Sequence, residues 1–266
     1  MPRTPVRVFP SPDAIGEQVA HLVLTRIEKA RWGDKRFVLG CPTGRTPRPI
    51  YRALARQLAE KPEDLSHVVL VMMDEYLVAV GSGYKYASAR KPWSCHHFAR
   101  VEIADRLNAS LLATQRLRED SIWFPDPRDP AVYDKRIADL GGIDFFILAS
   151  GASDGHVAFN PPGSARSSRT RIIQLSEDRR RDNLQTFPAF GTLAAVPDHG
   201  ISVGIDTIVS AKESVMIVWG IGKRLTLSRM KSAERYEPAW PATVIHECAL
   251  GEILADTDAA APLDAR

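Results

Sequence analysis

Unbroken apolar runs alternate along this chain with segments whose apolar residues recur every three or four positions. Residues 68–73 are all apolar, which is typical of a strand covered on both faces of a parallel sheet. Apolar runs at 37–39, at 143–148 with one interruption at Asp144, and at 215–219 predict three further strands, and helical spacing separates most of them. We therefore predict an α/β fold with an open, mostly parallel, Rossmann-like sheet flanked by helices on both faces.

The sequence also marks two helix starts. Ser11, Pro12 and Asp13 have the order of an N-cap, a first helical residue and a first-turn acid. A second helix follows the Pro-Thr-Gly-Arg-Thr-Pro turn at 42–47. Apolar residues then recur at helical spacing, at Ile15, Val19, Leu22, Val23 and Ile27 in the first helix and at Ile50, Leu54 and Leu58 in the second. We expect one domain over residues 1–258 and a flexible tail at 259–266.

Composition excludes several classes of protein but does not indicate a function. The chain has 266 residues, 44% hydrophobic and 25% charged, with a net charge of +3, so it is globular and not basic enough to predict nucleic-acid binding. No apolar run approaches the ~20 residues of a membrane span, and the first twelve residues lack the apolar stretch of a signal peptide. Three widely spaced cysteines predict no disulfide framework. We expect a cytoplasmic protein with no nucleic-acid or membrane partner, and leave open whether it is a homo-oligomer.

Small and polar residues follow four of the predicted strands. They are Thr43-Gly44, Asp74-Glu75, Asp154-Gly155-His156 and Lys223. Ligands of open parallel sheets bind outside the carboxyl ends of the strands, so we expect these groups to converge on one cleft.

Each group has a chemical interpretation and a plainer structural one. The turn around Gly44 could cradle a phosphate or simply join a strand to a helix. Asp74 could be a desolvated general base or a helix cap, and of two adjacent carboxylates on a strand only one should face the cleft. Asp154 and His156 could form a proton shuttle, although the tripeptide is common. Lys223 could bind phosphate or be a solvated surface charge.

Three further segments have simpler readings. The run Cys95-His96-His97 has no partner cluster, so we predict no zinc site. Residues 80–92 form a candidate mobile loop over the cleft. A basic stretch is read as a solvated face: Arg166, Arg169, Arg171, Arg179, Arg180 and Arg181.

Several strings together resemble the glucosamine-6-phosphate deaminase/isomerase family, which is related to the 6-phosphogluconolactonases. The most specific is Asp-Gly-His-Val-Ala-Phe-Asn at 154–160, preceded by Gly-Gly-Ile-Asp at 141–144 and followed by Ser-Arg-Thr-Arg-Ile at 168–172. Pro-Thr-Gly at 42–44 and Met-Asp-Glu-Tyr at 73–76 support it. The resemblance runs from about Phe37 to about Asp258.

The resemblance implies a role for each of these positions. Asp74 matches the base that moves a proton between C2 and C1 of an open-chain sugar, and His156 with its partner Asp154 matches the ring-opening acid/base. Thr43, Gly44 and Lys223 match positions that bind a phosphosugar, the expected small-molecule partner, and we add Arg45 and Arg171 as candidates. The family needs no metal or organic cofactor.

The chain also departs from the family pattern. Pro161 stands where the deaminases carry a Glu that assists ring opening, and Gln185 stands where an Arg is expected. Arg45 replaces a Gly of the phosphate turn, so its charge could compensate. Ile173 replaces the Lys of the allosterically regulated members, which argues against that form of control.

Three functions compete on these grounds. The first is a sugar-phosphate isomerase/deaminase acting on a hexosamine 6-phosphate. The second is a hydrolase of a phosphorylated sugar lactone, which needs His156 as a base for water but no base for a carbon-bound proton. The third is a non-catalytic sugar-phosphate sensor, motivated by Pro161 and Gln185. Residues 158–160 resemble the deaminases more than the lactonases.

Overall fold

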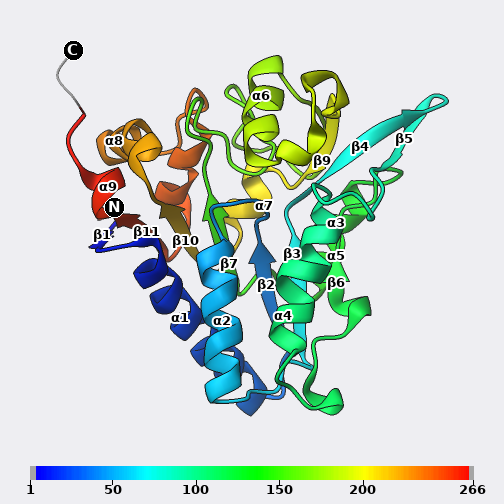
Figure 1. Cartoon of the computed structure of the whole chain (residues 1–266), viewed down its shortest axis with the longest axis vertical. Coiled ribbons are helices and arrows are strands. Elements are labelled where there is room, and N and C mark those ends of the chain that lie inside the picture. The colour runs from blue at the N-terminus through cyan, green and yellow to red at the C-terminus, as the bar shows by residue number, and fades with distance from the viewer. Residues whose placement is uncertain (1–3, 264–266) are drawn as a thin grey trace.

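A computed structural model describes the chain from residue 4 to residue 263, apart from the side chain of residue 178. Seven strands form a parallel sheet in the order β1-β11-β10-β7-β2-β3-β6 (Figure 1). Their bounds are β1 (Val6–Phe9), β2 (Phe37–Cys41), β3 (Val68–Met72), β6 (Ile122–Trp123), β7 (Phe145–Ala149), β10 (Glu213–Val218) and β11 (Gly251–Asp256). The prediction of an open parallel sheet with helices on both faces is confirmed, and all four predicted strands lie in it.

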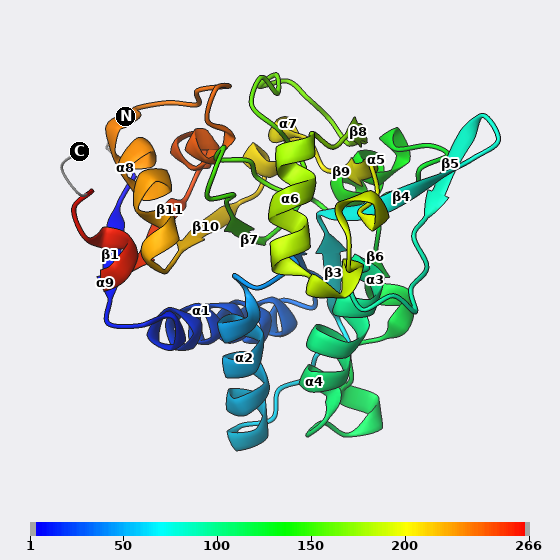
Figure 2. The same ribbon diagram turned by 45° about the horizontal axis from the view of Figure 1, so that its top comes forward.

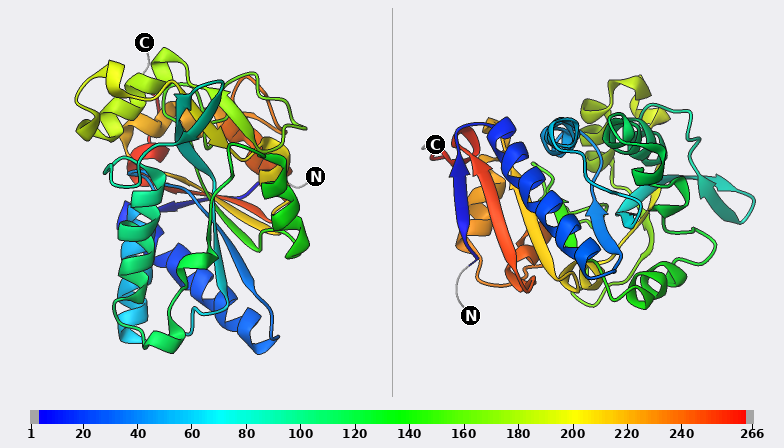
Figure 3. Two further views of the ribbon diagram at one scale, coloured as in Figure 1. Left: turned by 90° about the vertical axis from the view of Figure 1, so that its right-hand side faces the viewer. Right: turned by 90° about the horizontal axis from the view of Figure 1, so that it is seen from below.

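Helices cover both faces of this sheet (Figure 3). On one face α1 (Pro12–Trp32), α2 (Arg48–Glu60) and α4 (Asp105–Asn108) pack on the strands. On the other lie α5 (Ala131–Asp139), α7 (Ile205–Val209) and α8 (Arg224–Ser232). The remaining helices are α3 (Cys95–Phe98), α6 (Glu177–Thr186) and α9 (Thr257–Ala260). None of the helices in the described residues combines the length and apolar content that crossing a bilayer requires.

The two apolar layers explain why the strands have no polar alternation. In β2, Phe37 and Leu39 face the α1–α2 side, whereas Val38 faces the opposite layer. Successive side chains of a strand point to opposite faces, so a strand covered on both sides needs apolar residues at every position. The interruption at Asp144 lies just before β7: its carboxylate accepts a hydrogen bond from Val38 N at 2.8 Å and pairs with Lys212 at 2.6 Å.

The predicted helix signals are also confirmed. The Ser11 side chain accepts a hydrogen bond from Ala14 N at 3.2 Å and caps α1, with Pro12 as the first helical residue. The tail predicted at 259–266 does not begin at 259. Asp256 caps α9 through Ala259 N at 2.8 Å, and Ala259 is buried. Residues 264–266 lie outside the described residues.

A second, antiparallel sheet in the order β5-β4-β9-β8 was not predicted from the sequence. Its strands are β4 (Asp74–Val80), β5 (Gly83–Tyr86), β8 (Arg171–Gln174) and β9 (His199–Ser202). Tyr76 stands at the centre of its own aromatic core, 5.6 Å from the ring of Trp93 and 5.1 Å from that of Phe159. A single residue, Met73, separates β3 from β4, so the chain passes directly from the large sheet to the small one. Asp74 is therefore fixed at the junction of the two sheets.

Candidate active site

A cleft opens at the carboxyl ends of four adjacent strands, β10, β7, β2 and β3. Helix α6 lies close to these strand ends (Figure 2) and contributes side chains to the lining of the cleft. The structure brings most of the predicted site residues to this cleft, with others that were not predicted. Its lining includes Thr43, Gly44, Arg45, Asp74, Ser150, Gly151, His156, Arg179, Asp182, Asn183, Gln185 and Lys223. The convergence follows from the parallel topology, because neighbouring parallel strands end at the same edge.

The turn after β2 forms one wall of the cleft. Gly44 has φ +89°, a conformation that favours glycine, and this lets the turn fold back toward α2. Tyr51 Oη donates to the carbonyl of Pro42 at 2.8 Å, and Trp219 Nε1 donates to that of Thr46 at 2.8 Å. These two hydrogen bonds anchor the turn between β2 and α2, and residues 42–46 of the turn line the cleft. Arg45 projects from the turn as an exposed side chain at the cleft.

Asp74 contributes a buried carboxylate to the cleft. Only 5% of the residue is exposed, and burial raises its pKa to about 7, against the opposing charge of Arg179 and a hydrogen bond from Cys95. Glu75, fully buried, turns to the other side of β4 and binds the start of α3, as expected for adjacent residues of a strand. A carboxylate that titrates near pH 7 in a cleft is suited to general-base chemistry.

His156 and Asp154 form a hydrogen-bonded pair at the end of β7. The Nδ1 atom of His156 lies 2.5 Å from Asp154 Oδ1, and the His156 backbone N–H donates to the same oxygen at 3.1 Å. Burial lowers the pKa of His156 to about 4, and the charge of Arg179 adds to this effect. Burial alone would raise the pKa of Asp154, but its interactions with His156 bring it down to about 2. At neutral pH the pair is therefore a carboxylate and a neutral imidazole whose Nε2 is the unprotonated nitrogen.

The backbone around His156 is shaped to hold this ring. A side chain at Gly151 would place its Cβ 2.1 Å from the imidazole, so only glycine fits there. Ala158 adopts φ +52°, which is unusual for a residue with a side chain. Arg179 Nη2 donates to the Ala158 carbonyl at 3.1 Å, and the Cζ atom of Arg179 lies over the Phe159 ring, 5.3 Å from its centroid.

Two cations, Lys223 and Arg179, line the cleft together with Asp74. Lys223 donates to the Ser150 carbonyl, and burial together with the charge of Arg179 lowers its pKa to about 8. Burial also lowers the pKa of Arg179. Within the described residues, the buried Nε of Arg179 and the buried Nδ2 of Asn183 have no hydrogen-bond partner. Unsatisfied buried donors are costly, and two of them beside a lysine are suited to an anionic ligand.

Sequence reasoning missed Arg179 and Asn183. The prediction that the arginines between 166 and 181 form a solvated face is wrong for Arg179, which lines the cleft. Ser176 accepts from Arg179 N at 3.2 Å and caps α6, and Arg179, Asp182, Asn183 and Thr186 follow at helical spacing on the cleft side. That spacing is the signal that could have revealed them.

Arg171 does not line the cleft. Its guanidinium donates to Asn160 Oδ1 at 2.9 Å and to Ser164 Oγ at 3.2 Å, because β8 carries it behind the Asp-Gly-His segment. This placement does not favour the phosphate-binding role considered above.

Residues 80–92, all described, do not cover the cleft either. They begin with a β4–β5 hairpin that projects from the molecule in Figure 1. Tyr86 Oη fixes its base through the Pro125 carbonyl at 2.9 Å. The predicted placement of this segment over the cleft is therefore wrong.

Comparison with known proteins shows the family to which the chain belongs. The family described as glucosamine-6-phosphate isomerases/6-phosphogluconolactonase matches residues 10–254. Glucosamine-6-phosphate deaminase of Shouchella clausii is 31% identical over 254 residues, 93% of each chain. That of Dictyostelium discoideum is 34% identical, covering 93% of this chain and 89% of the relative.

Solved structures agree with the fold. A monomeric glucosamine-6-phosphate deaminase superposes with a TM-score of 0.77 at 25% identity, covering 96% of this chain and 98% of its own. The 6-phosphogluconolactonase of Thermotoga maritima gives a TM-score of 0.66 at 16% identity, covering 96% of this chain and 100% of its own, which is a likeness of fold alone.

Proposed function

The chain belongs to the family of glucosamine-6-phosphate isomerases and 6-phosphogluconolactonases, and we propose that it converts a hexosamine 6-phosphate and water into a ketose 6-phosphate and ammonia. The observation that carries this proposal is the buried carboxylate of Asp74, which shares one cleft with a neutral imidazole and two cations. Burial raises the pKa of this carboxylate to about 7. A base of this kind matches the removal of a proton from carbon α to a carbonyl.

The phosphate would bind at the cationic side of the cleft. Lys223 supplies one charge, and the donors without partners on Arg179 and Asn183 supply matching hydrogen bonds. The turn at Gly44 adds backbone N–H groups, and Arg45 adds charge at the rim. The family has an Arg where this chain has Gln185. Arg179, which lies six residues earlier on α6, would supply the missing guanidinium.

Ring opening would use His156. The neutral imidazole accepts the proton of the anomeric hydroxyl at Nε2 and returns a proton to the ring oxygen, while Asp154 holds Nδ1–H and stabilises the transient imidazolium. Pro161, at the position of the family Glu, has no titratable group and does not line the cleft. We therefore propose that Asp154 and His156 open the ring alone, and slowly.

Asp74 would then carry the isomerisation. Its carboxylate takes the proton from C2 of the open-chain aldehyde and delivers it to C1, while a proton of the C2 amine passes to O1, which leaves a hydroxyl at C1 and an imine at C2. Water adds to this imine and ammonia leaves, giving the ketose. A lactonase needs no group that moves a carbon-bound proton, so a buried carboxylate with a raised pKa favours the deaminase reading over hydrolysis of a lactone.

The test is to incubate the purified chain with hexosamine 6-phosphates and measure ammonia and ketose phosphate together. Asp74→Asn should lower kcat by about 10²–10⁴-fold, because the amide keeps the shape but cannot accept the proton. Asp139→Asn, the same change at an exposed ion pair with Lys135, is the matched control and should leave turnover unchanged.

Two results would contradict the proposal. One is full activity in Asp74→Asn. The other is hydrolysis of a phosphosugar lactone by the wild-type chain with no ammonia from any hexosamine phosphate, which would select the lactonase.

A further inference from the structure

We propose that Cys95 is a positioning residue whose thiol donates a hydrogen bond to Asp74 and fixes the carboxylate that takes the C2 proton. This inference rests on the proposed function, because it concerns the same base. It adds a residue that neither the sequence motifs nor the comparisons point to.

The thiol lies between two walls of the cleft. Cys95 is 2% exposed, and its Sγ is 3.4 Å from Asp74 Oδ1 and 3.4 Å from Thr43 Oγ1. Among the described residues this is the one hydrogen bond that the Asp74 carboxylate accepts. With the thiol proton directed at Asp74, the Thr43 hydroxyl donates to sulfur, so a chain of hydrogen bonds joins the proposed phosphate turn to the proposed base.

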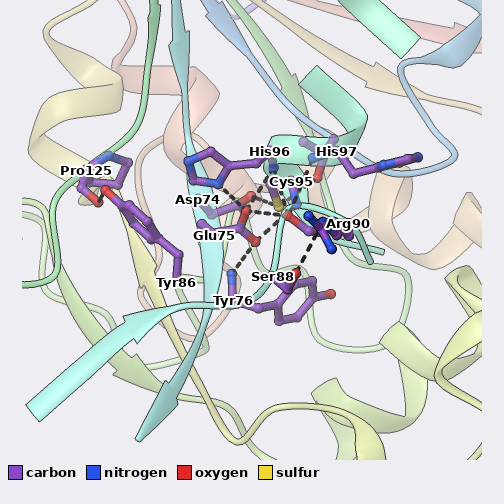
Figure 4. Close-up of polar contacts among 12 residues, drawn as sticks. Asp74, Glu75, Tyr76, Tyr86, Ser88, Arg90, Cys95, His96, His97 and Pro125 are labelled. Carbon is purple, nitrogen blue, oxygen red and sulfur yellow. Dashed lines mark hydrogen bonds and ion pairs between the residues drawn. The ribbon is translucent and has the colours of Figure 1, made fainter. Parts of the chain in front are cut away.

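Glu75 holds Cys95 in this position (Figure 4). One of its oxygens accepts from Cys95 N at 3.0 Å, and the other accepts from Ser94 Oγ and His96 N, both at 2.8 Å. The side chains of Asp74 and Glu75 point to opposite sides of β4, and both engage Cys95. Glu75 thus fixes the first turn of α3, and α3 presents the thiol to Asp74.

The chemistry of the thiol is suited to this role. Burial raises the pKa of Cys95 well above its ordinary value, so the group stays protonated and acts as a neutral donor. A donor stabilises the charged form of a carboxylate, which opposes the effect of burial on Asp74. Removing it should therefore raise the pKa of Asp74 and leave the carboxylate free to rotate.

The test is the pH dependence of kcat/KM for hexosamine 6-phosphate deamination. Cys95→Ala and Cys95→Val both remove the donor, one with a smaller and one with a larger side chain. Each should move the acidic limb to higher pH and reduce kcat at pH 7 by about 3- to 10-fold, with KM little changed. Cys95→Ser, which keeps a donor, should retain the wild-type limb.

Cys248→Ala is the matched control. This thiol is also buried, but it contacts the Val244 carbonyl at 3.6 Å and lies outside the cleft, so its loss should not move the limb. A wild-type profile in both Cys95→Ala and Cys95→Val would overturn the inference. So would an equal shift in Cys95→Ser, because packing alone would then explain the effect.

A second measurement separates this inference from the proposed function. If the wild-type chain releases no ammonia, the proposed function fails, but the protonation of Asp74 can still be followed through stability. The difference in free energy of unfolding between the chain and Asp74→Asn should grow as pH rises from about 4 and level off above the pKa of Asp74 in the folded chain. In a Cys95→Ala background it should level off at a higher pH, and a plateau that begins at the same pH as before would refute the role of Cys95.

Discussion

At the scale of single residues, burial in the cleft moves the pKa values of an acid and a base toward neutral pH. The pKa of Asp74 rises to about 7 and that of Lys223 falls to about 8. The ionised carboxylate and the protonated amine therefore coexist in the free enzyme chiefly between these two values. Both forms are needed, the first to accept a proton and the second to bind phosphate.

This arrangement predicts a narrow pH optimum. We expect kcat/KM to fall below pH 7 as Asp74 takes up a proton and above pH 8 as Lys223 loses one. Lys223→Arg should remove the lysine's contribution to the alkaline limb, because the guanidinium stays charged. Initial rates across pH 5.5 to 9.5, on the order of eight points for each protein, measure both limbs. An alkaline limb that is identical in Lys223→Arg would show that Lys223 does not bind the phosphate.

The same raised pKa predicts that Asp74 destabilises the fold. Between about pH 4 and pH 7 the unfolded chain ionises this group while the folded chain keeps it protonated, so stability is lost as pH rises through that window. Asp74→Asn should thus be more stable than wild type at pH 8, by about 4 kcal/mol, and the difference should shrink toward pH 3.5. Urea unfolding at both pH values tests this. If the variant were less stable than wild type at pH 8, the raised pKa of Asp74 would be wrong.

At the scale of elements, α6 connects the small sheet to the cleft. The helix carries Arg179 and Asn183 on its cleft side, whereas Arg181 is exposed and pairs with Glu177. One helix thus offers the same residue type in two environments.

We predict that Arg179→Ala raises KM for the phosphosugar by about 10- to 100-fold, since a hydrogen bond to a charged group contributes about 1.5–3 kcal/mol. Arg181→Ala removes the same charge from the same helix and should change KM by less than about twofold, because an exposed pair contributes little. Steady-state kinetics of the two variants measures KM for the phosphosugar and tests this prediction. Equal effects in both would mean that net charge, and not contact, governs binding.

The elements also show what the sequence could and could not predict. Four of the seven strands of the main sheet, β2, β3, β7 and β10, were predicted because burial on both faces forbids polar alternation, as at residues 68–73, whereas β1, β6 and β11 were not predicted. The turn motifs converge on one cleft because the carboxyl ends of neighbouring parallel strands lie at the same edge of the sheet. The small sheet was not predictable, since β5, β8 and β9 have only four residues each, β8 and β9 lie far from β4 in the sequence, and β4 and β5 are partly exposed. Arg179 was missed for a related reason: helical spacing shows that it shares a face with Asn183, but the burial of that face depends on α6 folding over the cleft.

At the scale of the whole molecule, the cleft draws on both sheets. The large sheet supplies His156 and Lys223, the junction supplies Asp74, and α6, which follows β8 of the small sheet, supplies Arg179. A ligand that bridges these parts binds the folded chain and not the unfolded one. Its binding free energy therefore adds to global stability.

This coupling predicts a thermal shift that does not depend on turnover. A hexose 6-phosphate at 100 times its Kd should stabilise the chain by about 2.7 kcal/mol and raise Tm by roughly 5–10 °C. Asp74→Asn should keep the shift, because the proposed phosphate ligands are intact, whereas Arg179→Ala and Lys223→Ala should lose most of it at the same ligand concentration. The parent sugar without phosphate is the control for the ligand. A shift as large with that sugar, or one that survives in both cation variants, would show that the cleft does not hold the ligand by its phosphate.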